Sequence, residues 1–309
     1  MNTIHWILIL LAIIYFVILI KAKRHARTAN KYLGGVFVVI SALIIITPFV
    51  WLVCSVFKDA TVLMQYSFLP PVEQWSKETL NLKNFYDLFA GEETPQGKVY
   101  FWQYIINSIF LSCAGTTIGL FLTSLSGYAL AKYKFKGRGV LIFFMAGSMM
   151  FPAMLFLGPL YEIIFKLNWM DTYYALLIPG ACAVFGIFLF RQAMQSVPDS
   201  LIEAARIDGA GEFRIYWDVV MPLVRPMTGA YCLITFLGNW NNFLSPQIYI
   251  QSQSKLTLPV ILNQYIGVYA QQYGIFLAGT LLAIIPPAIL FFALQKEFVA
   301  GLTTGATKG

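Results

Sequence analysis

The sequence predicts an all-α integral membrane protein, because of its composition and because of where its charged residues fall. Apolar residues make up 59% of the 309 residues, charged residues only 11%, and the mean hydropathy of +0.70 is well above that of soluble proteins. A helix needs about 20 apolar residues to cross roughly 30 Å of bilayer hydrocarbon. Uncharged runs near or above this length occupy residues 4–20, 32–57, 99–131, 140–161, 172–190, 226–254 and 256–295.

The last of these runs is too long for one helix, and its beginning is rich in glutamine, asparagine and tyrosine. We therefore expect a polar loop over residues 256–272 and a helix over residues 273–294. Each of the other runs has the length of one span. The prediction is about seven transmembrane helices.

Lysine and arginine are distributed unevenly over the segments between the runs. Fifteen of the 21 lie in residues 21–31, 132–138, 191–225 and the C-terminal segment. Cytoplasmic loops carry the excess of positive charge, so we place these segments and the C-terminus in the cytoplasm and the N-terminus outside. The net charge of +7 then reflects topology, and the basic clusters lack the interleaved aromatics of a nucleic-acid surface.

The chain divides into four parts on this topology. Residues 1–31 form an extra N-terminal helix with a basic linker, residues 32–101 the first core helix and an external loop, residues 102–296 the main transmembrane domain, and residues 297–309 a cytoplasmic tail.

The first run is either a signal peptide or an uncleaved anchor, and the absence of a preceding positive region and a following cleavage site favours the anchor. The external loop, with a short helix near residues 82–89, is either solvated or a contact surface for an external binding protein.

A charged loop over about residues 192–226 is the most distinctive segment of the chain. Such a segment cannot lie in hydrocarbon, because each charge would be very costly there. Nine charged side chains lie in it or at its edge: Arg191, Asp199, Glu203, Arg206, Asp208, Glu212, Arg214, Asp218 and Arg225. The loop must therefore lie in water between two spans.

Within this loop the sequence predicts a short helix. Ser200 and Glu203 have the spacing of a capping box, which begins a helix, and Gly209 suits the left-handed residue that ends one. A helix of about two turns is not stable alone in water. We therefore expect it to dock on a partner protein, whose close approach Ala204 and Ala205 would allow.

The loop resembles the EAA loop of ABC-importer permeases of the binding-protein-dependent, type I class. The chain has Val219 and Met221 where isoleucine and leucine are usual in that family, and otherwise keeps the spacing of the motif at Glu203, Ala204, Ala205, Gly209 and Pro222. From about residue 32 to its end the chain is also similar to the maltose-type carbohydrate permease subunit. The matching segments are Asn107–Ser108, Gly127–Ala131, Phe135–Arg138, Pro159–Tyr161, Trp240–Asn241 and Gly301–Gly309.

This resemblance implies a six-helix permease core in the bacterial cytoplasmic (inner) membrane, to which residues 4–20 add one helix. It implies a heteromeric importer with a second homologous permease, two ATPase subunits that bind ATP and Mg²⁺, and an extracytoplasmic solute-binding protein that delivers a sugar. The resemblance assigns contact with the ATPase subunits to two groups of residues. They are Glu203, Ala204, Ala205, Asp208, Gly209 and Pro222 in the loop, and Gly301, Leu302, Thr303, Thr304 and Gly305 in the tail.

Several absences in the sequence weigh against other functions. No acidic or basic residue lies in the middle of a run, whereas proton-coupled carriers usually keep an ionisable relay there. Sodium can be bound by unwound backbone carbonyls, so an ion-coupled secondary transporter is the alternative. The chain has no phosphate loop of the Gly-x-x-x-x-Gly-Lys-Ser/Thr type, and it has no nucleophile–base pair or metal-ligand cluster. We therefore expect no enzyme activity, cofactor or metal site in this chain.

Four residues are candidates for a substrate path, namely Asn239, Trp240, Asn241 and Asn242. Three amides around an indole suit the hydrogen-bonding and stacking needs of a sugar. The other interpretation is that these amides make hydrogen bonds between helices. Relatives in the family often have an acidic residue in place of Asn242.

Overall fold

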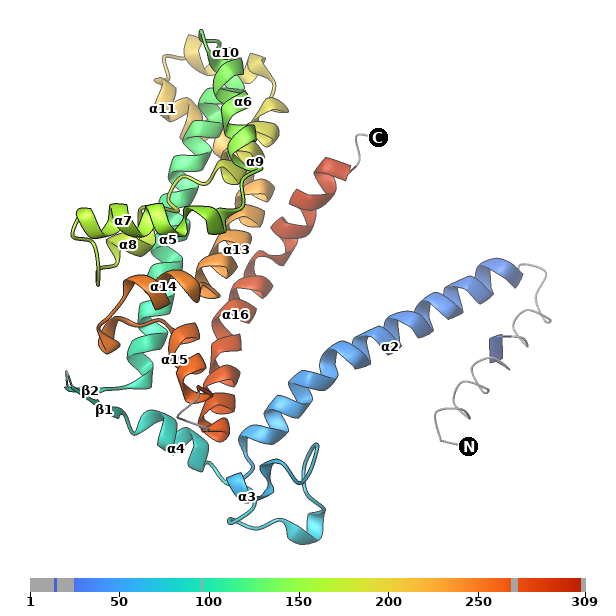
Figure 1. Ribbon diagram of the computed structural model, residues 1–309. Helices are drawn as coiled ribbons and strands as arrows, with labels where there is room; N and C mark the ends of the chain where they lie inside the picture. The colour runs from blue at the N-terminus through green and yellow to red at the C-terminus, as the bar shows by residue number, and fades with distance from the viewer. Residues whose placement is uncertain (1–13, 16–24, 96, 268–271, 307–309) are drawn as a thin grey trace. The chain divides into compact units, whose positions relative to one another are not determined.

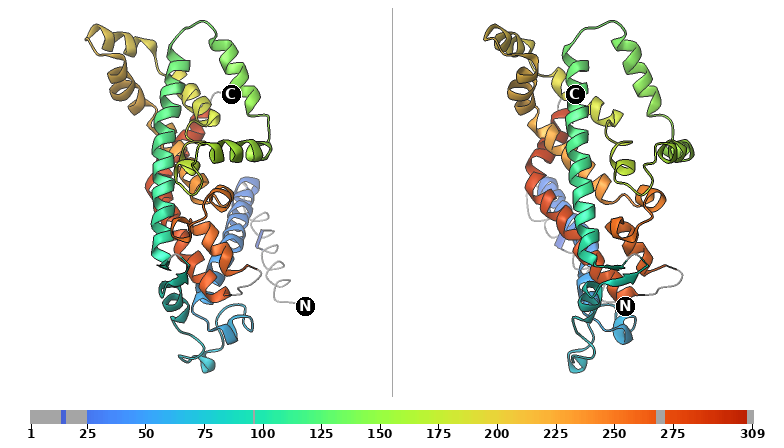
Figure 2. Two further views of the ribbon diagram at one scale, coloured as in Figure 1. Left: turned by 60° about the vertical axis from the view of Figure 1, so that its left-hand side comes forward. Right: turned by 90° about the vertical axis from the view of Figure 1, so that its left-hand side faces the viewer.

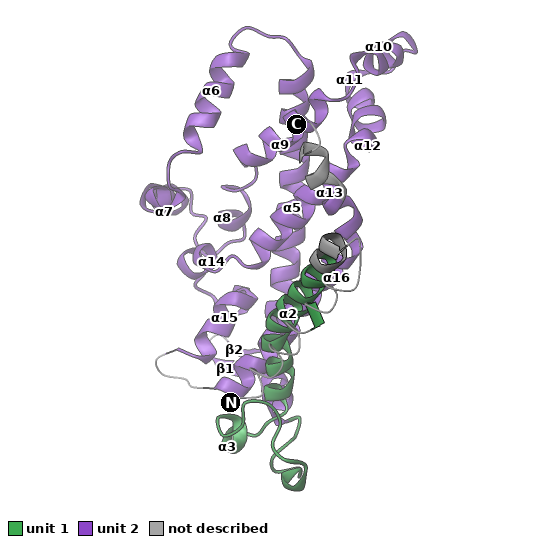
Figure 3. Ribbon diagram, turned by 90° about the vertical axis from the view of Figure 1, so that its right-hand side faces the viewer, with its two compact units in different colours: residues 1–82 green, residues 83–309 purple. Residues whose placement is uncertain are grey.

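The computed structural model describes residues 14–15, 25–95, 97–267 and 272–306, and nearly all elements in these ranges are helices (Figures 1 and 2). Contacts divide the chain into two compact units, residues 1–82 and residues 83–309 (Figure 3). The functional residues predicted from the sequence all lie in the second unit.

The first unit consists of one long helix followed by a folded loop. Helix α2 (His25–Val56) contains Pro48, and its apolar side chains are largely exposed, as expected for a helix that faces lipid. The loop contains α3 (Ala60–Leu63) and the 3₁₀ turn η1 (Val72–Gln74). It is held together by the buried Lys58, whose ammonium group donates a 2.6 Å hydrogen bond to the carbonyl oxygen of Tyr66.

The second unit begins with a short helix and a hairpin that the sequence analysis only partly anticipated. Helix α4 (Lys83–Phe89) confirms the helix expected near residues 82–89. The antiparallel hairpin of β1 (Glu92–Thr94) and β2 (Gly97–Val99) was not expected. The remaining elements are α5 (Phe101–Lys132), α6 (Arg138–Ser148), η2 (Ala153–Phe156), α7 (Leu157–Lys166), α8 (Tyr174–Leu177), α9 (Val184–Gln195), α10 (Asp199–Ile207), α11 (Glu212–Arg214), η3 (Ile215–Val220), α12 (Met221–Leu223), α13 (Arg225–Trp240), α14 (Leu244–Tyr249), η4 (Gln253–Lys255), α15 (Leu258–Tyr265) and α16 (Tyr273–Ala306).

Helix α5 is the central element of the second unit, and α9 and α13 pack along it (Figure 2). Glycines allow these helices to approach closely. A Cβ atom at Gly127 would lie 2.6 Å from the Cβ atom of Phe190 and 2.9 Å from the backbone nitrogen of Arg191. At Gly186 on α9, a Cβ atom would lie 2.6 Å from the ring of Tyr231 on α13. Small residues at such contacts are typical of helix packing in membranes, where van der Waals contact drives association.

Three described helices are long and apolar enough to cross a bilayer, and up to five spans result if each of two bent helix pairs is one span. The first predicted run, residues 4–20, lies outside the described residues except for residues 14–15. Residues 138–166 form a pair of helical segments bent by 94°, and α13 is bent by 85° from the helical segment before it. The run at residues 172–190 is divided between α8 and α9, with Pro179 and Gly180 in the non-helical segment between them.

The C-terminal third differs from the prediction in two further respects. The expected polar loop over residues 256–272 contains a helix, α15. The helix expected over residues 273–294 extends to Ala306, although it contains Pro286 and Pro287. Residues 297–306 of the predicted cytoplasmic tail are helical, because the helix of the last span continues through them.

We expect Gly127→Ala to lower the free energy of unfolding by about 1–3 kcal/mol, because the atoms that the new methyl group meets belong to the backbone or to a Cβ atom and cannot move aside. Gly147→Ala is the control, since a Cβ atom at Gly147 on α6 meets nothing within 4 Å. Thermal unfolding in detergent, followed by tryptophan fluorescence, measures both variants. Equal midpoints for the two variants would contradict this account of the α5–α9 contact.

Candidate functional site

The predicted short helix in the charged loop is present as α10, but it begins differently from the prediction. Pro198 is its N-cap residue, and Ser200 lies inside the first turn and makes no capping hydrogen bond. The prediction of a capping box formed by Ser200 and Glu203 is therefore wrong. Asp199 occupies the first turn instead, where a negative charge interacts favourably with the helix dipole.

The end of α10 confirms the conformation predicted for Gly209. Its φ of +79° is left-handed, a region that glycine enters without steric cost. The N–H of Gly209 donates to the carbonyl of Arg206 at 3.0 Å, and the N–H of Ala210 donates to the carbonyl of Ala205 at 2.9 Å. This pair of bonds is a Schellman motif, which satisfies carbonyl groups that the helix end would otherwise leave without partners.

One face of α10 is anchored in a buried cluster that joins the loop to the transmembrane helices. Ile202 is only 4% exposed, and Tyr216 on η3 is 1% exposed. The hydroxyl groups of Tyr216 and Ser124 on α5 share a 2.7 Å hydrogen bond. The buried cluster consists of Tyr128, Phe190, Met194, Val197, Ile202, Ile215, Tyr216, Val220, Val224 and Tyr231. The loop is therefore packed on α5, α9 and α13 and does not hang freely from them.

The opposite face of α10 is exposed and includes an apolar side chain that the sequence analysis missed. Glu203 and Ala204 are exposed beside Ile207, which is 86% exposed. Phe213 and Trp217 are also exposed, and their rings stack at 6.5 Å. Apolar side chains in the middle of a charged loop were the available sequence signal. An exposed apolar cluster of this kind is typical of a protein interaction surface.

Ion pairs stabilise the conformation of the loop, and Glu203 takes part in none of those found among the described residues. The ammonium group of Lys132 at the end of α5 lies 2.7 Å from the carboxylate of Asp199, and hydrogen bonds from Lys132 lower the pKa of Asp199 below its ordinary value. Arg206 makes two hydrogen bonds to Glu212, at 2.8 and 3.2 Å, and these lower the pKa of Glu212. Within the part of the chain that the structure describes, the side chain of Glu203 has no such partner.

The segment that follows α10 contains an unusual helical turn. Residues 215–220 of η3 are wound as a π-helix, a form that is rare and frequent at functional sites. Pro222 follows directly and has no N–H to donate to the preceding turn. Pro222 is exposed and lines an apolar groove of about 470 Å³ between η3 and α5. Of the residues predicted for coupling, Glu203, Ala204 and Asp208 are exposed together on α10, while Pro222 lies on the adjoining segment.

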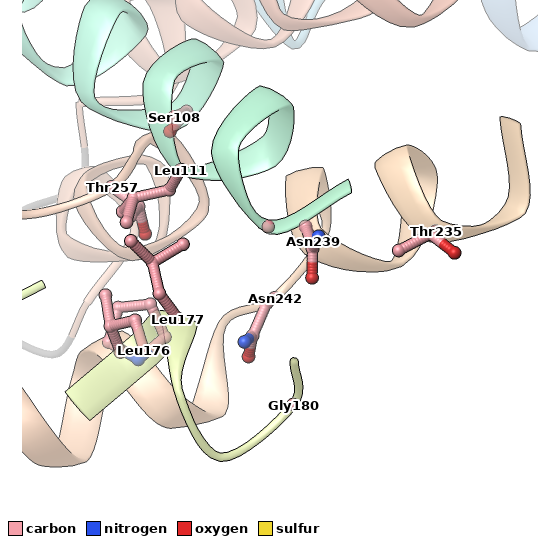
Figure 4. Close-up of a pocket in the computed structure, with 11 residues that line it drawn as sticks. Ser108, Leu111, Leu176, Leu177, Gly180, Thr235, Asn239, Asn242 and Thr257 are labelled. Carbon is pink, nitrogen blue, oxygen red and sulfur yellow. The ribbon is translucent and has the colours of Figure 1, made fainter. Parts of the chain in front are cut away.

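The structure places two of the four candidate path residues at a cavity and two elsewhere. The cavity, of about 50 Å³, lies between α5, α8 and α13 (Figure 4). Asn239 and Asn242 line it, whereas Trp240 is buried and stacks on Phe236 at 5.9 Å. The amide of Asn241 donates to the carbonyl of Leu237 within its own helix. The proposed role of Asn239 and Asn242 in a path stays a prediction, and the geometry does not bring Trp240 or Asn241 to the same space.

Other polar residues at this cavity were not identified as a group from the sequence. Thr235 precedes Asn239 by one helical turn, and Ser108 and Thr257 line the opposite wall. The spacing of four residues between Thr235 and Asn239 was the available signal. A cavity of about 50 Å³ holds water, which needs only about 10–15 Å³ for one molecule. Pockets for organic ligands are far larger, at about 300–1,000 Å³.

The C-terminal helix is tied to the helix that follows the loop. The guanidinium group of Arg225, at the beginning of α13, lies 3.3 Å from the carboxylate of Glu297 on α16. A Cβ atom at Gly229 would lie 2.5 Å from the Cβ atom of Glu297, so the two helices touch at this glycine. The predicted tail contact, residues 301–305, lies on the continuation of α16. Its role stays a prediction.

Comparison with known proteins identifies the family of the chain. The family of the binding-protein-dependent transport system inner membrane component matches residues 115–303, more than half of the chain. The chain belongs to this family. It is a transport permease of the inner membrane, and the match includes the whole charged loop and the cavity residues from Gly115 onward.

Two relatives are similar over nearly their whole length. The permease is 35% identical over 287 residues to the arabinooligosaccharides transport system permease protein AraQ of Halalkalibacterium halodurans, covering 93% of this chain and 100% of AraQ. It is 29% identical to the lactose transport system permease protein LacG of Rhizobium radiobacter, covering 85% of this chain and 91% of LacG.

A solved structure shares the fold of the permease. It is a bacterial ABC transporter involved in the import of the acidic polysaccharide alginate, and the match has a TM-score of 0.76 with 24% identity. It covers 90% of this chain and 99% of the matched chain. The match confirms the predicted permease fold.

We expect Gly209→Val to loosen the end of α10. A left-handed residue other than glycine costs about 1–2 kcal/mol, or roughly a factor of 5 to 30 in the population of the open loop. Gly209→Asn is the matched control, because asparagine tolerates this conformation better. A Cβ atom at Gly209 meets nothing within 4 Å, so the two variants differ in backbone preference and not through a clash.

Limited trypsin cleavage at Arg206 and Arg214 in detergent measures the opening of the loop. Cleavage should be faster in Gly209→Val than in Gly209→Asn, and slowest in the wild type. Equal cleavage rates in the two variants would remove the backbone explanation.

Proposed function

We propose that this permease is one subunit of an ATP-driven importer that moves a carbohydrate, such as an oligosaccharide, across the bacterial inner membrane. The other subunits are a second, homologous permease, two ATPase subunits that bind ATP and Mg²⁺, and an extracytoplasmic solute-binding protein that delivers the sugar. This chain makes and breaks no bond in the substrate. Its N-terminus is outside and its C-terminus and charged loop are in the cytoplasm, as the distribution of lysine and arginine indicates.

The arrangement of the charged loop carries this proposal. Glu203, Ala204 and Ile207 form an exposed face on a helix whose other face is buried in the cluster around Tyr216. A partner that binds the exposed face and moves will displace α5, α9 and α13 with it, because close-packed interiors transmit displacement. Because the chain belongs to a family of transport-system membrane components, we take this partner to be an ATPase subunit.

The proposed substrate class is supported by the relatives and by the cavity. AraQ and LacG are named for oligosaccharide and lactose transport. The cavity walls carry neutral hydrogen-bonding groups, among them the amides of Asn239 and Asn242 and the hydroxyl of Thr257. Such groups match the hydroxyl groups of a neutral sugar. The cavity is too small for a sugar ring, so transport requires its walls to separate.

Reconstitution tests the function. Proteoliposomes that contain the permease pair and the ATPase subunits, with the binding protein outside and ATP inside, should accumulate oligosaccharide. Omitting ATP or the binding protein should abolish uptake. Uptake that needs a sodium or proton gradient and no ATPase subunit would overturn the proposal in favour of an ion-coupled secondary transporter.

We expect Glu203→Lys to reduce uptake in this assay at least tenfold and Glu203→Gln to reduce it less. Glu203 projects from the exposed face without a cation partner among the described residues, so it is available to a basic residue of an ATPase subunit. Charge reversal leaves two like charges together, whereas glutamine keeps a hydrogen-bonding group. Because no capping box forms, an effect of these substitutions cannot be explained by a capping role of Glu203 at the beginning of the helix.

Glu162→Lys is the control for charge reversal, because Glu162 is also an exposed glutamate and lies on α7, away from the loop. It pairs with Lys166, and an exposed pair of this kind contributes little to stability. This substitution should leave uptake unchanged. Normal assembly and uptake in Glu203→Lys would contradict the anchoring role.

We further propose that the end of α16, including residues 301–305, reaches the ATPase subunits in the assembled importer. The helical continuation of the last span to Ala306 supports a defined projection, since α16 ends beyond the Arg225–Glu297 ion pair. Deleting residues 300–309 should leave membrane insertion intact and lower ATPase activity and its coupling to uptake. Membrane extraction and the ratio of ATP hydrolysed to sugar imported measure the two effects. Wild-type coupling in the truncated importer would rule this role out.

A further inference from the structure

A strap formed by residues 250–258 crosses one end of the cavity and connects α14 to α15. Thr257 of the strap lines the cavity, and its buried hydroxyl has no hydrogen-bond partner among the described residues. The wall on one side is α5, with Ser108 and Gly115, and the wall on the other side includes Leu176 and Leu177 of α8. The strap is bound to both sides, so the cavity can widen only if one attachment gives way.

Asp171, in the loop between α7 and α8, makes the attachment on the α8 side. Its carboxylate accepts hydrogen bonds from the backbone N–H groups of Gln251 and Ser252, at 3.1 and 2.9 Å, and from the hydroxyl of Ser252 at 2.5 Å. The ammonium group of Lys255 donates to the same carboxylate at 3.0 Å and to the Asp171 carbonyl at 2.6 Å. The N–H of Asp171 donates to the carbonyl of Tyr249 at 2.8 Å.

Two further features make this side of the strap firm. Tyr249, directly before the strap, is 1% exposed and packs in a buried cluster with Ile164 of α7 and Ala175 of α8. Asp171 has a φ of +57°, a left-handed conformation that costs energy in residues other than glycine. Such a conformation persists where surrounding contacts hold it, and the strap supplies these contacts. Burial alone would raise the pKa of Asp171, but the hydrogen bonds from the strap lower it well below its ordinary value.

The attachment to α5 consists of fewer contacts, and all of them are neutral. The amide of Asn107 donates to the carbonyls of Ser254 and Leu256, at 2.8 and 3.0 Å. The N–H of Leu258 donates to the hydroxyl of Ser108 at 2.7 Å. Charge-assisted hydrogen bonds are about twice as strong as neutral ones. Leu256 and Leu258 are buried beside this seam, so both attachments include apolar contact and they differ in their hydrogen bonds. In its hydrogen bonds, the seam between the strap and α5 is the weaker of the two attachments.

We propose that the strap, α14 and the α7–α8 loop form one outer gate. The gate opens at its seam with Asn107 and Ser108 of α5. Asp171 is the positioning residue that joins the strap to the α7–α8 loop. This inference rests on the proposed function, because it treats the cavity as part of the transport path. Opening at this seam separates Ser108 from Thr257 and so opens the cavity at the wall that these two residues share.

Two pairs of cysteines, one on each edge of the strap, test the proposal. The background is a variant in which Cys54, Cys113, Cys182 and Cys232 are replaced by serine. The first pair, Asn107→Cys with Ser254→Cys, bridges the seam with α5, and the second, Asp171→Cys with Ser252→Cys, replaces the attachment to the α7–α8 loop. Both are treated with a short thiol cross-linker that a reductant cleaves, and oligosaccharide uptake is measured before and after each step.

The two pairs should respond to cross-linking in opposite directions. Cross-linking residues 107 and 254 should lower uptake at least tenfold, and reduction should restore it. The pair at residues 171 and 252 should transport poorly when reduced, because the carboxylate is lost, and cross-linking should restore uptake. Full uptake with residues 107 and 254 cross-linked would overturn the proposal, as would a block of uptake by cross-linking residues 171 and 252.

A readout that does not depend on the substrate separates failure of this inference from failure of the proposed function. Spin labels replace the cross-linker on residues 107 and 254 in the assembled importer, and their separation is measured with and without a non-hydrolysable ATP analogue. The distance between residues 107 and 254 should increase. A constant distance between residues 107 and 254 would overturn the gate even if oligosaccharide uptake is normal. The predicted movement without sugar uptake would instead contradict the substrate class.

Discussion

The contact on which the charged loop depends is the burial of Ile202 and Tyr216 among the aromatic side chains at the ends of α5, α9 and α13. Apart from Lys132, the side chains that form ion pairs around the loop are exposed, and exposed pairs contribute little to stability. Burying one large apolar side chain contributes about 1.5–3 kcal/mol. The apolar cluster therefore fixes the position of the loop, and the ion pairs mainly set the orientation of its ends. A loop that is rich in charge is in this way attached firmly to a membrane core.

The helices that carry the loop are held together by close approach and not by large apolar surfaces. Lipid tails solvate apolar side chains as well as a neighbouring helix does, so the hydrophobic effect gives no preference for helix–helix contact within the bilayer. Gly127 instead lets two helix backbones touch, and Gly186 and Gly229 let side chains of a neighbouring helix reach the glycine. The contact at Gly229 links α13 to α16. The beginning of the helix after the loop is therefore connected directly to the C-terminal helix.

Charge is distributed in this permease according to the solvent that each region meets. The cavity is lined by amides, hydroxyls and leucine side chains, which cost less to bury than charges do. The ionised groups, Lys132, Asp199, Asp171 and Lys255, lie where water or several hydrogen bonds stabilise them. This separation suits the passage of a neutral, hydroxyl-rich molecule. The charge-assisted contacts described here lie at the loop and at the strap, and the lining of the cavity includes none of their ionised groups.

Much of the architecture followed from the sequence because its causes are local. The rough positions of the long apolar helices, the charged loop between two of them and the left-handed Gly209 all depend on residue type and spacing within one segment. The sequence was misleading at residues 172–190, where composition alone does not show that Pro179 and Gly180 interrupt the helix. It was also misleading at Ser200, because Pro198 begins α10 before the capping residue that the spacing suggested.

What only the tertiary structure decided is which polar residues meet. Asn239 and Asn242 reach the cavity while Trp240 and Asn241 do not, because the helix ends at Trp240 and each residue then takes its own direction. Asp171 and Ser252 are 81 residues apart, and no periodicity connects them. Such contacts depend on how bent helices pack against one another, a property of the whole fold. The sequence by itself determined the membrane fold and the charged loop, and packing decided the cavity and the contacts of the strap.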